Sequence, residues 1–461
     1  MKTLQMLIIV LFTFFALTAC KNDKKEKEVG TVDTKESITP KTLGFIYTTT
    51  NGESENQVVQ LARYEDGTLG EEKIYPTKGK GGSNHTAPAH GDYDGQGNLK
   101  IIDNYLLTTN PGDNTITVFN LNKSNGTLVF NSIVNSEGKF PLTLDFAPVD
   151  DTKQEYWVVV GNQWATPTVL YDGEELKRYP SDEWLSQDLT AKDESDKDRS
   201  VELFKLDTKT GKLTFVKTLA EYTRENGGPA DVKFSPDGTK IAVSTWGIPH
   251  FFSKDPQLKE IHSSRVYVYD FNQGGVSNVR YFEEEGLSGA VGFHWNNNSK
   301  NIYITYFNII NAKSENGLVV LKDDEGKVTK ASNHRTGKSE FIDEACWTAI
   351  SKDQKRLYVC SYITNEITTF ELDENGNVTK TLGVERRQGY QPNEDSKDLY
   401  ISPDNEYLYM LGSFFSYSVN TLKITDDGVK YMHQYTLKET EKEVGNPGVY
   451  DLVGLDGFDF Q

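Results

Sequence analysis

The stretch GGPADVKFSPDGTKIAVSTWG (Gly227–Gly247), followed after an interruption by SRVYVYDF (Ser264–Phe271), contains three runs in which apolar and polar residues alternate. Alternation with a period of two is typical of β-strands that bury one face. Pro236-Asp237-Gly238 separates the first two runs and favours a tight turn, because Pro fixes φ and Gly tolerates a positive φ. Because one meander of short strands cannot bury both of its faces, the chain should contain further copies.

Further copies occur along the chain in two forms. A polar turn followed by a short apolar and aromatic strand recurs at NNNSKNIYITY (Asn296–Tyr306), SKDQKRLYVCS (Ser351–Ser361) and SPDNEYLYMLG (Ser402–Gly412). A strand that enters a turn rich in Asp, Asn and Gly recurs at VVQLARYEDGTL (Val58–Leu69), ITVFNLNKSNGTL (Ile116–Leu128), VELFKLDTKTGKL (Val201–Leu213) and ITTFELDENGNV (Ile367–Val378).

These elements combine into seven units, which start near Phe45, Asn104, Glu155, Lys240, Asn301, Arg356 and Tyr407. The equivalent turn residues Asp353 and Asp404 are 51 positions apart. A period near 50 residues with four short strands in each unit predicts an all-β, seven-bladed β-propeller.

The two ends of the repeat region are complementary. The first unit begins at its second strand, Gly44–Thr50, and the chain finishes with GVYDLVGLDGFDF (Gly448–Phe460), an alternating strand that belongs to no complete unit. We expect residues from Tyr450 to Phe460 to supply the innermost strand of the first blade. Closure by the C-terminal strand would leave no unpaired sheet edge there.

Residues 1–20 have the pattern of a bacterial lipoprotein signal peptide. Lys2 supplies a positive charge, Leu4–Ala16 is apolar but too short for a transmembrane helix, and Leu17-Thr18-Ala19-Cys20 resembles a lipobox. We therefore expect lipidation at Cys20 and an outer-membrane lipoprotein on the periplasmic or cell-surface side. The alternative is an ordinary signal peptide in which Cys20 occurs by chance.

Residues 21–42 are charged and poor in apolar residues, which predicts a flexible tether. Residues 43–461 are then one propeller domain. The net charge of −19 argues against a nucleic-acid partner, because nucleic-acid binding requires a basic surface. We expect a monomer that binds a small molecule or a protein at the mouth of the propeller.

Cys346 and Cys360 flank one predicted hairpin almost symmetrically. An exported protein can form a disulfide, but pairing depends on a register that one residue would change. The sequence leaves both a disulfide and two buried thiols open.

Two insertions, residues 164–199 and 247–263, interrupt the repeat between the second and third strands of neighbouring units. In a four-stranded meander these loops and the inter-blade loops emerge on the same face, which is the predicted mouth. Long loops on a rigid scaffold often carry function, although both insertions could equally form a cap over the ring.

The inter-blade loops of the predicted mouth gather residues suited to an anionic or sugar-like ligand. Arg binds carboxylate or phosphate groups, and His or Glu can transfer protons. The candidates from these loops, from the second insertion and from the residue directly before it are His85, His90, Arg224, Trp246, His250, Glu344 and Arg386. The alternative is that these residues are polar only because loops are exposed. No cofactor motif is recognised, and the pair His85 and His90 has no third metal ligand in view.

Several segments resemble the lactonase-family seven-bladed propellers, which include 6-phosphogluconolactonase-like and carboxymuconate-cyclising proteins. These segments are Pro88-Ala89-His90, NYLLTTNPGDNTITVFNLNKSNGTL (Asn104–Leu128), GPADVKFSPDGTKIAVS (Gly228–Ser244) and ACWTAISKDQKRLYVCSYITNEITTFELDENG (Ala345–Gly376). The resemblance extends over residues 43–458 and implies a propeller fold and hydrolysis of a lactone or a related cyclisation.

The same resemblance suggests His90, which occupies the Pro-Ala-His position, as the proton-transfer residue. Among the candidates from the mouth loops, Glu344 would be a second acid or base. His85, Arg224, Trp246, His250 and Arg386 would bind the substrate. The chain departs from the active members at Gly227–Asp231, where a mid-chain His is absent. A non-catalytic propeller that binds a ligand or a partner is therefore the alternative function.

Overall fold

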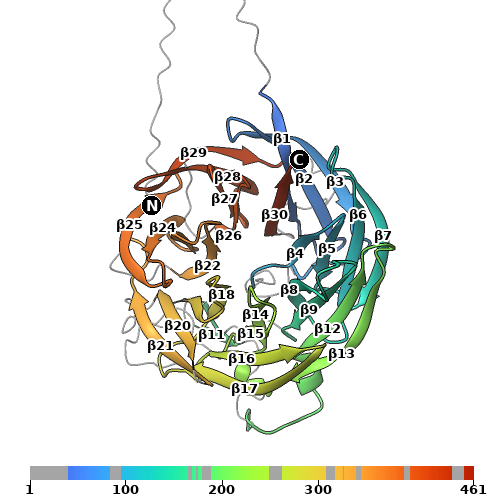
Figure 1. The fold of residues 1–461 in the computed structure, drawn as a ribbon, viewed down its shortest axis with the longest axis vertical. Coiled ribbons are helices and arrows are strands. Elements are labelled where there is room, and N and C mark those ends of the chain that lie inside the picture. The colour runs from blue at the N-terminus through green and yellow to red at the C-terminus, as the bar shows by residue number, and fades with distance from the viewer. Residues whose placement is uncertain are drawn as a thin grey trace, which may run out of the picture. The chain divides into compact units, whose positions relative to one another are not determined.

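Figure 1 shows the computed structural model of the protein. It describes residues 40–83, 95–164, 169–172, 175–178, 188–248, 262–307, 317–324, 326–338, 344–388, 395–438 and 451–460. Seven four-stranded antiparallel sheets are arranged around a central axis, so the predicted seven-bladed all-β propeller is confirmed.

The first three blades, each given from its inner to its outer strand, contain the following strands. Blade 1 consists of β30 (Val453–Asp459), β1 (Thr42–Thr49), β2 (Gln57–Tyr64) and β3 (Leu69–Pro76). Blade 2 consists of β4 (Leu99–Ile102), β5 (Tyr105–Asn110), β6 (Thr115–Leu121) and β7 (Leu128–Asn135). Blade 3 consists of β8 (Pro141–Pro148), β9 (Glu155–Asn162), β12 (Ser200–Asp207) and β13 (Leu213–Glu221).

The other four blades continue in chain order. Blade 4 consists of β14 (Pro229–Phe234), β15 (Lys240–Thr245), β16 (Arg265–Asn272) and β17 (Gly275–Glu283). Blade 5 consists of β18 (Ala290–Trp295), β19 (Asn301–Tyr306), β20 (Leu318–Asp324) and β21 (Lys327–His334). Blade 6 consists of β22 (Ala345–Ile350), β23 (Arg356–Ser361), β24 (Glu366–Leu372) and β25 (Val378–Arg386). Blade 7 consists of β26 (Ser396–Ile401), β27 (Tyr407–Gly412), β28 (Ser418–Thr425) and β29 (Gly428–Thr436).

The C-terminal strand closes the ring as the sequence indicated. β30 pairs with β1, with Phe45 opposite Phe458, and it lies against the inner strands β26 and β4 of the two neighbouring blades. Apolar side chains continue across this closure, since Ile46 and Leu61 of blade 1 share one buried cluster with Tyr409 of blade 7. Strand pairing and inter-blade packing therefore both join the ends of the repeat region.

The two faces of the ring differ in their connections. One face carries the turns from the first to the second strand and from the third to the fourth strand of each blade; we call it the turn face. The other carries the loops from the second to the third strand and the inter-blade loops; we call it the loop face. On the loop face, the segment between β9 and β12 contains β10 (Val169–Asp172), β11 (Glu175–Arg178) and η1 (Asp196–Asp198), and η2 (Arg224–Asn226) lies between β13 and β14.

Cys346 and Cys360 are free, buried thiols. The register between β22 and β23 shifts between Ala345 and Trp347, so that Trp347 is opposite Cys360 and Cys346 has no direct partner on β23. This β-bulge means that the two cysteines are not directly opposite each other on the neighbouring strands. Within the described ranges, no helix is both long and apolar enough to cross a lipid bilayer.

Candidate functional site

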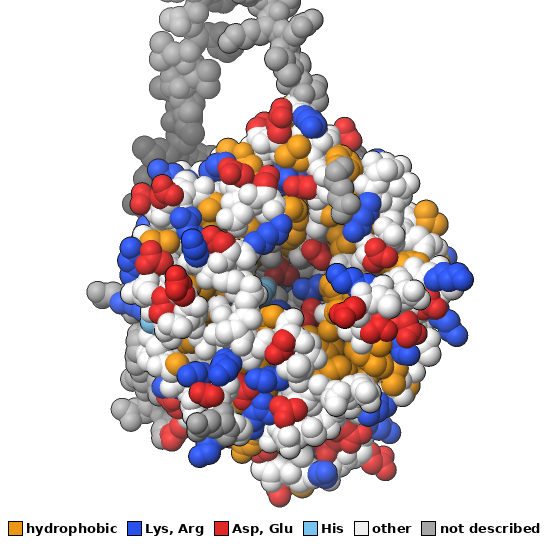
Figure 2. Space-filling view, in the orientation of Figure 1, with side chains coloured by type: hydrophobic (Ala, Val, Ile, Leu, Met, Phe, Trp, Pro, Cys, Tyr) orange, Lys and Arg blue, Asp and Glu red, His pale blue; other side chains and the backbone are white. Residues whose placement is uncertain are grey.

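The inner strands carry polar and charged side chains at the centre of the ring. Each of the seven blades contributes at least one, and together they form what we call the central polar cluster: Lys100 of β4, Asp145 of β8, Asp231 and Lys233 of β14, His294 of β18, Thr348 of β22, Asp398 of β26 and Asp456 of β30. Figure 2 shows a hollow at the centre of the ring, with basic, acidic and histidine side chains visible inside it.

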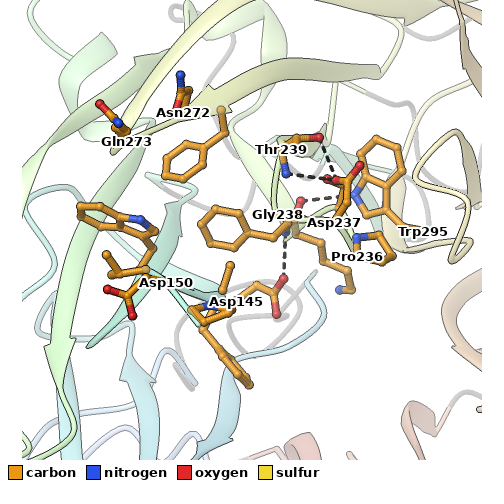
Figure 3. A pocket seen from close by; sticks show the side chains of 18 of the residues that line it. Asp145, Asp150, Pro236, Asp237, Gly238, Thr239, Asn272, Gln273 and Trp295 are labelled. Carbon is orange, nitrogen blue, oxygen red and sulfur yellow. Dashed lines mark hydrogen bonds between the residues drawn. The ribbon is translucent and has the colours of Figure 1, made fainter. Parts of the chain in front are cut away.

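A pocket of about 890 Å³ gives access to this cluster from the turn face. Its floor includes Lys100, Asp145, Lys233 and His294, and its walls come mainly from the turns and strand ends of blades 3 and 4. Figure 3 shows Asp145 low in the pocket, with Asp150 on one wall and Asp237 on the opposite one. The volume is in the range of pockets that bind small molecules.

His294 is the titratable group in the floor that is best suited to accept a proton. Its Nδ1 atom lies 2.8 Å from Thr348 Oγ1, which fixes the plane of the ring. Burial, followed by the positive charges of Lys233 and Lys100, places the pKa of His294 well below the ordinary value of 6.5. The imidazole is therefore neutral at neutral pH and able to act as a base.

Lys233 is held in place by Asp231. Its Nζ atom lies 2.5 Å from Asp231 Oδ2, and the same carboxylate accepts hydrogen bonds from Thr143 Oγ1 and from the backbone N–H of Phe293, both at 3.1 Å. Asp231 is fully buried, so its charge is balanced by Lys233 and these donors. The ammonium group of Lys233 therefore has a fixed position in the pocket floor.

Lys100 lies in the same floor but, among the described residues, no acceptor is within hydrogen-bonding or ion-pair distance of its Nζ atom. Burial alone would lower the pKa of Lys100, but the carboxylates of Asp145, Asp456, Asp398 and Asp231 outweigh burial and raise it. Lys100 therefore remains a cation whose hydrogen-bonding capacity is available to a ligand.

The carboxylates around Lys100 are oriented by backbone N–H groups. Asp145 accepts a hydrogen bond from Phe234 N at 2.9 Å, and Asp456 accepts one from Ile101 N at 2.8 Å. Burial raises the pKa of Asp145, Asp398 and Asp456 above the ordinary range of an aspartate, against the opposing effect of the nearby lysines or backbone donors. Of the groups with a shifted pKa, Lys100, Asp145 and His294 line the same pocket, which is typical of a functional site.

The segment that precedes β4 reaches across the ring to the inner strands of blades 5, 6 and 7. Gln96 Nε2 donates to Thr348 O at 2.8 Å and to Asp398 Oδ1 at 2.9 Å, and the backbone of Gly95 accepts a hydrogen bond from Trp347 Nε1 at 2.9 Å. The close fit requires glycine, since a Cβ atom on Gly292 would lie 2.1 Å from Gln96 Oε1. The backbone N–H of Gln96 donates to Ala230 O, so the segment lies near the loop-face end of β14.

Several residues predicted from the sequence lie outside the described residues: Cys20, His85, His90 and His250. Their roles stay predictions. The other four candidates, Arg224, Trp246, Glu344 and Arg386, are described.

Arg224 is held by the first insertion. Its Nε atom lies 2.9 Å from Asp193 Oδ2, and its Nη2 atom donates to Asp188 O at 3.0 Å. Trp246 is fully buried and packs edge-to-face on Phe307 with ring centroids 4.5 Å apart. Both side chains thus have contacts that stabilise the loop face.

Glu344 and Arg386 differ in exposure. The side chain of Glu344 is buried, and its backbone has a φ of 49°, which few residues other than glycine adopt. Arg386 is exposed at the end of β25, opposite Glu366 of β24. The topology places both residues on the loop face together with Arg224.

The sequence interpretation did not identify the central polar cluster. The signal available was a charged residue or a histidine inside a short apolar inner strand, as in PADVKF (Pro229–Phe234) and AVGFHW (Ala290–Trp295). Within the described part of the chain, no three His, Cys, Asp or Glu side chains are arranged to hold a metal ion.

The chain was compared with known proteins. The family model described as a lactonase, 7-bladed beta-propeller, matches residues 15–175. None of the curated proteins compared with the chain matches it.

Solved structures share the fold at low sequence identity. The periplasmic gluconolactonase of Pseudomonas aeruginosa has a TM-score of 0.59 and 13% identity, and the match covers 91% of this chain and 100% of that chain. A Bacteroides fragilis protein provisionally assigned as a 6-phosphogluconolactonase has a TM-score of 0.56 and 12% identity, with 90% and 98% covered. A Lactobacillus plantarum protein has a TM-score of 0.58 and 13% identity, with 90% and 99% covered. At this identity the structures show the fold alone.

The resemblance that the repeats indicated is thereby confirmed. The chain is a seven-bladed β-propeller that is similar to the lactonase family in sequence over residues 15–175, and it shares its fold with solved structures over most of its length.

Proposed function

We propose that the protein hydrolyses a sugar or carboxylate lactone in the turn-face pocket, with His294 as the general base. The observation that carries the proposal is a histidine with a lowered pKa, fixed by Thr348 and placed beside two lysines at the floor of a pocket. The match to the lactonase family model supports this class of reaction.

The geometry suits attack of water on an ester carbonyl. With Nδ1 donating to Thr348 Oγ1, the Nε2 atom of His294 carries a lone pair and can take a proton from the attacking water. As the new C–O bond forms, negative charge develops on the carbonyl oxygen, and the ammonium group of Lys100 can donate a hydrogen bond to it. The ring C–O bond then breaks and the imidazolium returns its proton to the ring oxygen, which gives the hydroxy acid.

The residues predicted from the sequence define a second location for the same reaction. Glu344, Arg224 and Arg386 belong to the loop face, for which His90 was predicted, whereas His294 lines the pocket of the turn face. The two locations use different side chains. Single substitutions can therefore distinguish the two.

A non-catalytic binding propeller is the second candidate function. It is favoured by the contacts of Arg224 with Asp193 and Asp188, which attach part of the first insertion to the loop face. These contacts use an arginine that was predicted to bind an anionic substrate, and they leave the insertion as a surface for a ligand or a protein partner.

The decisive experiment measures acid release from a panel of sugar and aromatic-acid lactones by the purified protein, corrected for spontaneous hydrolysis. We expect His294→Asn to lower kcat/KM by about 10²–10⁴-fold. His433→Asn is a matched control, because His433 is also a partly buried histidine with a lowered pKa but lies on the outer strand β29.

Loss of activity in His90→Ala with full activity in His294→Asn would place the reaction on the loop face. Absence of turnover by the wild type across the panel would favour the binding function.

We also propose that Cys20 carries a lipid anchor and that the propeller is tethered to a membrane. The lipobox-like sequence and the charged segment 21–42 support this location. We expect Cys20→Ala to move the protein from the membrane fraction to the soluble fraction, since acyl chains would supply the binding energy. Mass spectrometry of the mature N-terminus is the direct test, and an unmodified N-terminus beyond residue 20 would contradict the proposal.

A further inference from the structure

The rim of the turn-face pocket is acidic. Asp150, Asp151 and Asp237 line the pocket and are exposed to solvent. Figure 3 shows Asp150 and Asp237 on opposite sides of the opening. Among the described residues that line the pocket, the lysines are Lys100 and Lys233 in the floor, and no arginine is present. A ligand that enters must therefore pass carboxylates before it reaches a cation.

The positive charges of the two floor lysines are largely offset by neighbouring carboxylates, so they attract a phosphate only weakly. Lys233 is paired with Asp231, and Lys100 is surrounded by four carboxylates, which raise its pKa. Proteins that bind phosphate usually present arginines, a helix N-terminus or a cluster of backbone N–H groups. The lining residues of this pocket belong to strands and to the turns between them, and η1 and η2 contribute none.

The walls suit an uncharged ligand with many hydroxyl groups. Trp157, Phe146 and Trp295 provide aromatic surface, against which the C–H face of a sugar ring can pack. Figure 3 shows Asn272 and Gln273 together on one side of the pocket. Their amide groups can donate to or accept from sugar hydroxyls.

We infer that the pocket selects uncharged, hydroxyl-rich lactones and rejects phosphorylated ones, and that Asp150, Asp151 and Asp237 are the residues that determine this specificity. The inference rests on the proposed function, whose site it uses. Repulsion between a phosphate dianion and three carboxylates within about one Debye length predicts a preference of about tenfold at low salt, which becomes smaller as salt is added.

The test uses binding as well as turnover, so that the two proposals can fail separately. The probes are a six-membered sugar lactam, which has the carbonyl and hydroxyl groups of the lactone but does not hydrolyse, and the 6-phosphate of that lactam. Calorimetric titration of the full protein should give a Kd about tenfold lower for the lactam than for its phosphate at low salt. The ratio should fall toward one at 0.5 M salt.

Charge-removing variants identify the residues. Asp151→Asn and the triple change Asp150→Asn, Asp151→Asn and Asp237→Asn should improve binding of the phosphate several-fold and leave binding of the lactam within about twofold. Asparagine keeps the side-chain oxygen that accepts from Thr152 N at Asp150 and from Thr239 N at Asp237, so the turns should persist. Asp66→Asn is the matched control, because Asp66 accepts from Thr68 N in the same kind of turn but does not line the pocket.

Equal or tighter binding of the phosphorylated lactam by the wild type would overturn the inference, and so would failure of both lactams to bind. Selective binding of the uncharged lactam without turnover of any lactone would support the inference and contradict the proposed hydrolysis. Faster hydrolysis of a phosphorylated lactone than of its uncharged form would support hydrolysis and contradict the inference.

Discussion

The ammonium nitrogen of Lys397 lies 3.0 Å from Asp451 Oδ2, and both side chains are buried. Lys397 belongs to β26 of blade 7, and Asp451 precedes β30, which completes blade 1. The other oxygen of Asp451 accepts hydrogen bonds from Asn51 Nδ2 and Ser83 Oγ, which follow β1 and β3. One buried ion pair thus ties the last blade to both ends of the first.

We expect Asp451→Asn to destabilise the protein by about 3–5 kcal/mol, because it leaves the charge of Lys397 buried without its partner. The double variant Asp451→Asn, Lys397→Met should recover part of this loss. Thermal and denaturant unfolding provide the measurement. Lys423→Gln is the control: Lys423 pairs with Glu406 where both side chains are substantially exposed, and its loss should cost less than about 1 kcal/mol.

Removal of residues 450–461 should abolish cooperative unfolding. Without β30, the inner edge of β1 is left unpaired and the inner strands β26 and β4 lose a neighbour. Near-ultraviolet circular dichroism during heating tests this expectation. Restoration of a sharp transition by a synthetic peptide of residues 450–461 would show that the missing strand is the cause, whereas a sharp transition in the truncated chain alone would contradict it.

The fold could be predicted because each blade repeats the same short sequence patterns, which are turn residues and alternating apolar and polar positions. The expected strand starts near Asn301 and Arg356 are the starts of β19 and β23, and the displaced C-terminal strand is β30. Turn residues and alternation act over a few neighbouring positions, so the sequence displays them directly.

The central polar cluster could not be predicted in the same way. Alternation shows that every second residue of an inner strand shares a face, but a β-bulge reverses which face that is. The register shifts between Pro229 and Asp231 on β14 and between Ala290 and Phe293 on β18. Lys233 and His294 come after these bulges in their strands, so the bulges decide which face they occupy. No residue pattern in the sequence marks the bulges.

Thr348 should act as a positioning residue for His294. Thr348→Val removes the oxygen that lies 2.8 Å from His294 Nδ1, so the ring loses its fixed tautomer and orientation. We expect kcat to fall by about tenfold or more with KM nearly unchanged. Thr348→Ser keeps the hydroxyl group and should restore most of the activity. A similar loss in both variants would indicate a packing role for Thr348 instead.

The pH dependence of hydrolysis should reflect the lowered pKa of His294. Because burial and the charges of Lys233 and Lys100 disfavour the imidazolium, kcat/KM should remain constant from pH 7 down through 6.5 and decline only at lower pH. Lys100→Met removes one positive charge, which makes protonation of His294 easier and moves the acid limb to higher pH. An acid limb that moves to lower pH in Lys100→Met would contradict the assignment of His294 as the base.

Glu202 on β12 gives a prediction about stability that is independent of the proposed site. Burial is the main reason that the pKa of Glu202 rises from 4.5 to about 7, and the charges of Glu137 and Glu221 act in the same direction. Between about pH 4.5 and 7 the unfolded chain has released this proton while the folded chain still binds it, so stability falls as pH rises through this range. A pKa shift of this size lowers the free energy of unfolding by about 3 kcal/mol above pH 7, since one pKa unit is about 1.4 kcal/mol.

Glu202→Gln should therefore stabilise the protein by up to about 3 kcal/mol at pH 8 and leave it nearly unchanged at pH 4. Denaturant unfolding of both proteins at the two pH values measures the difference, and an equal effect at pH 4 and pH 8 would show that the ionisation of Glu202 is not its cause.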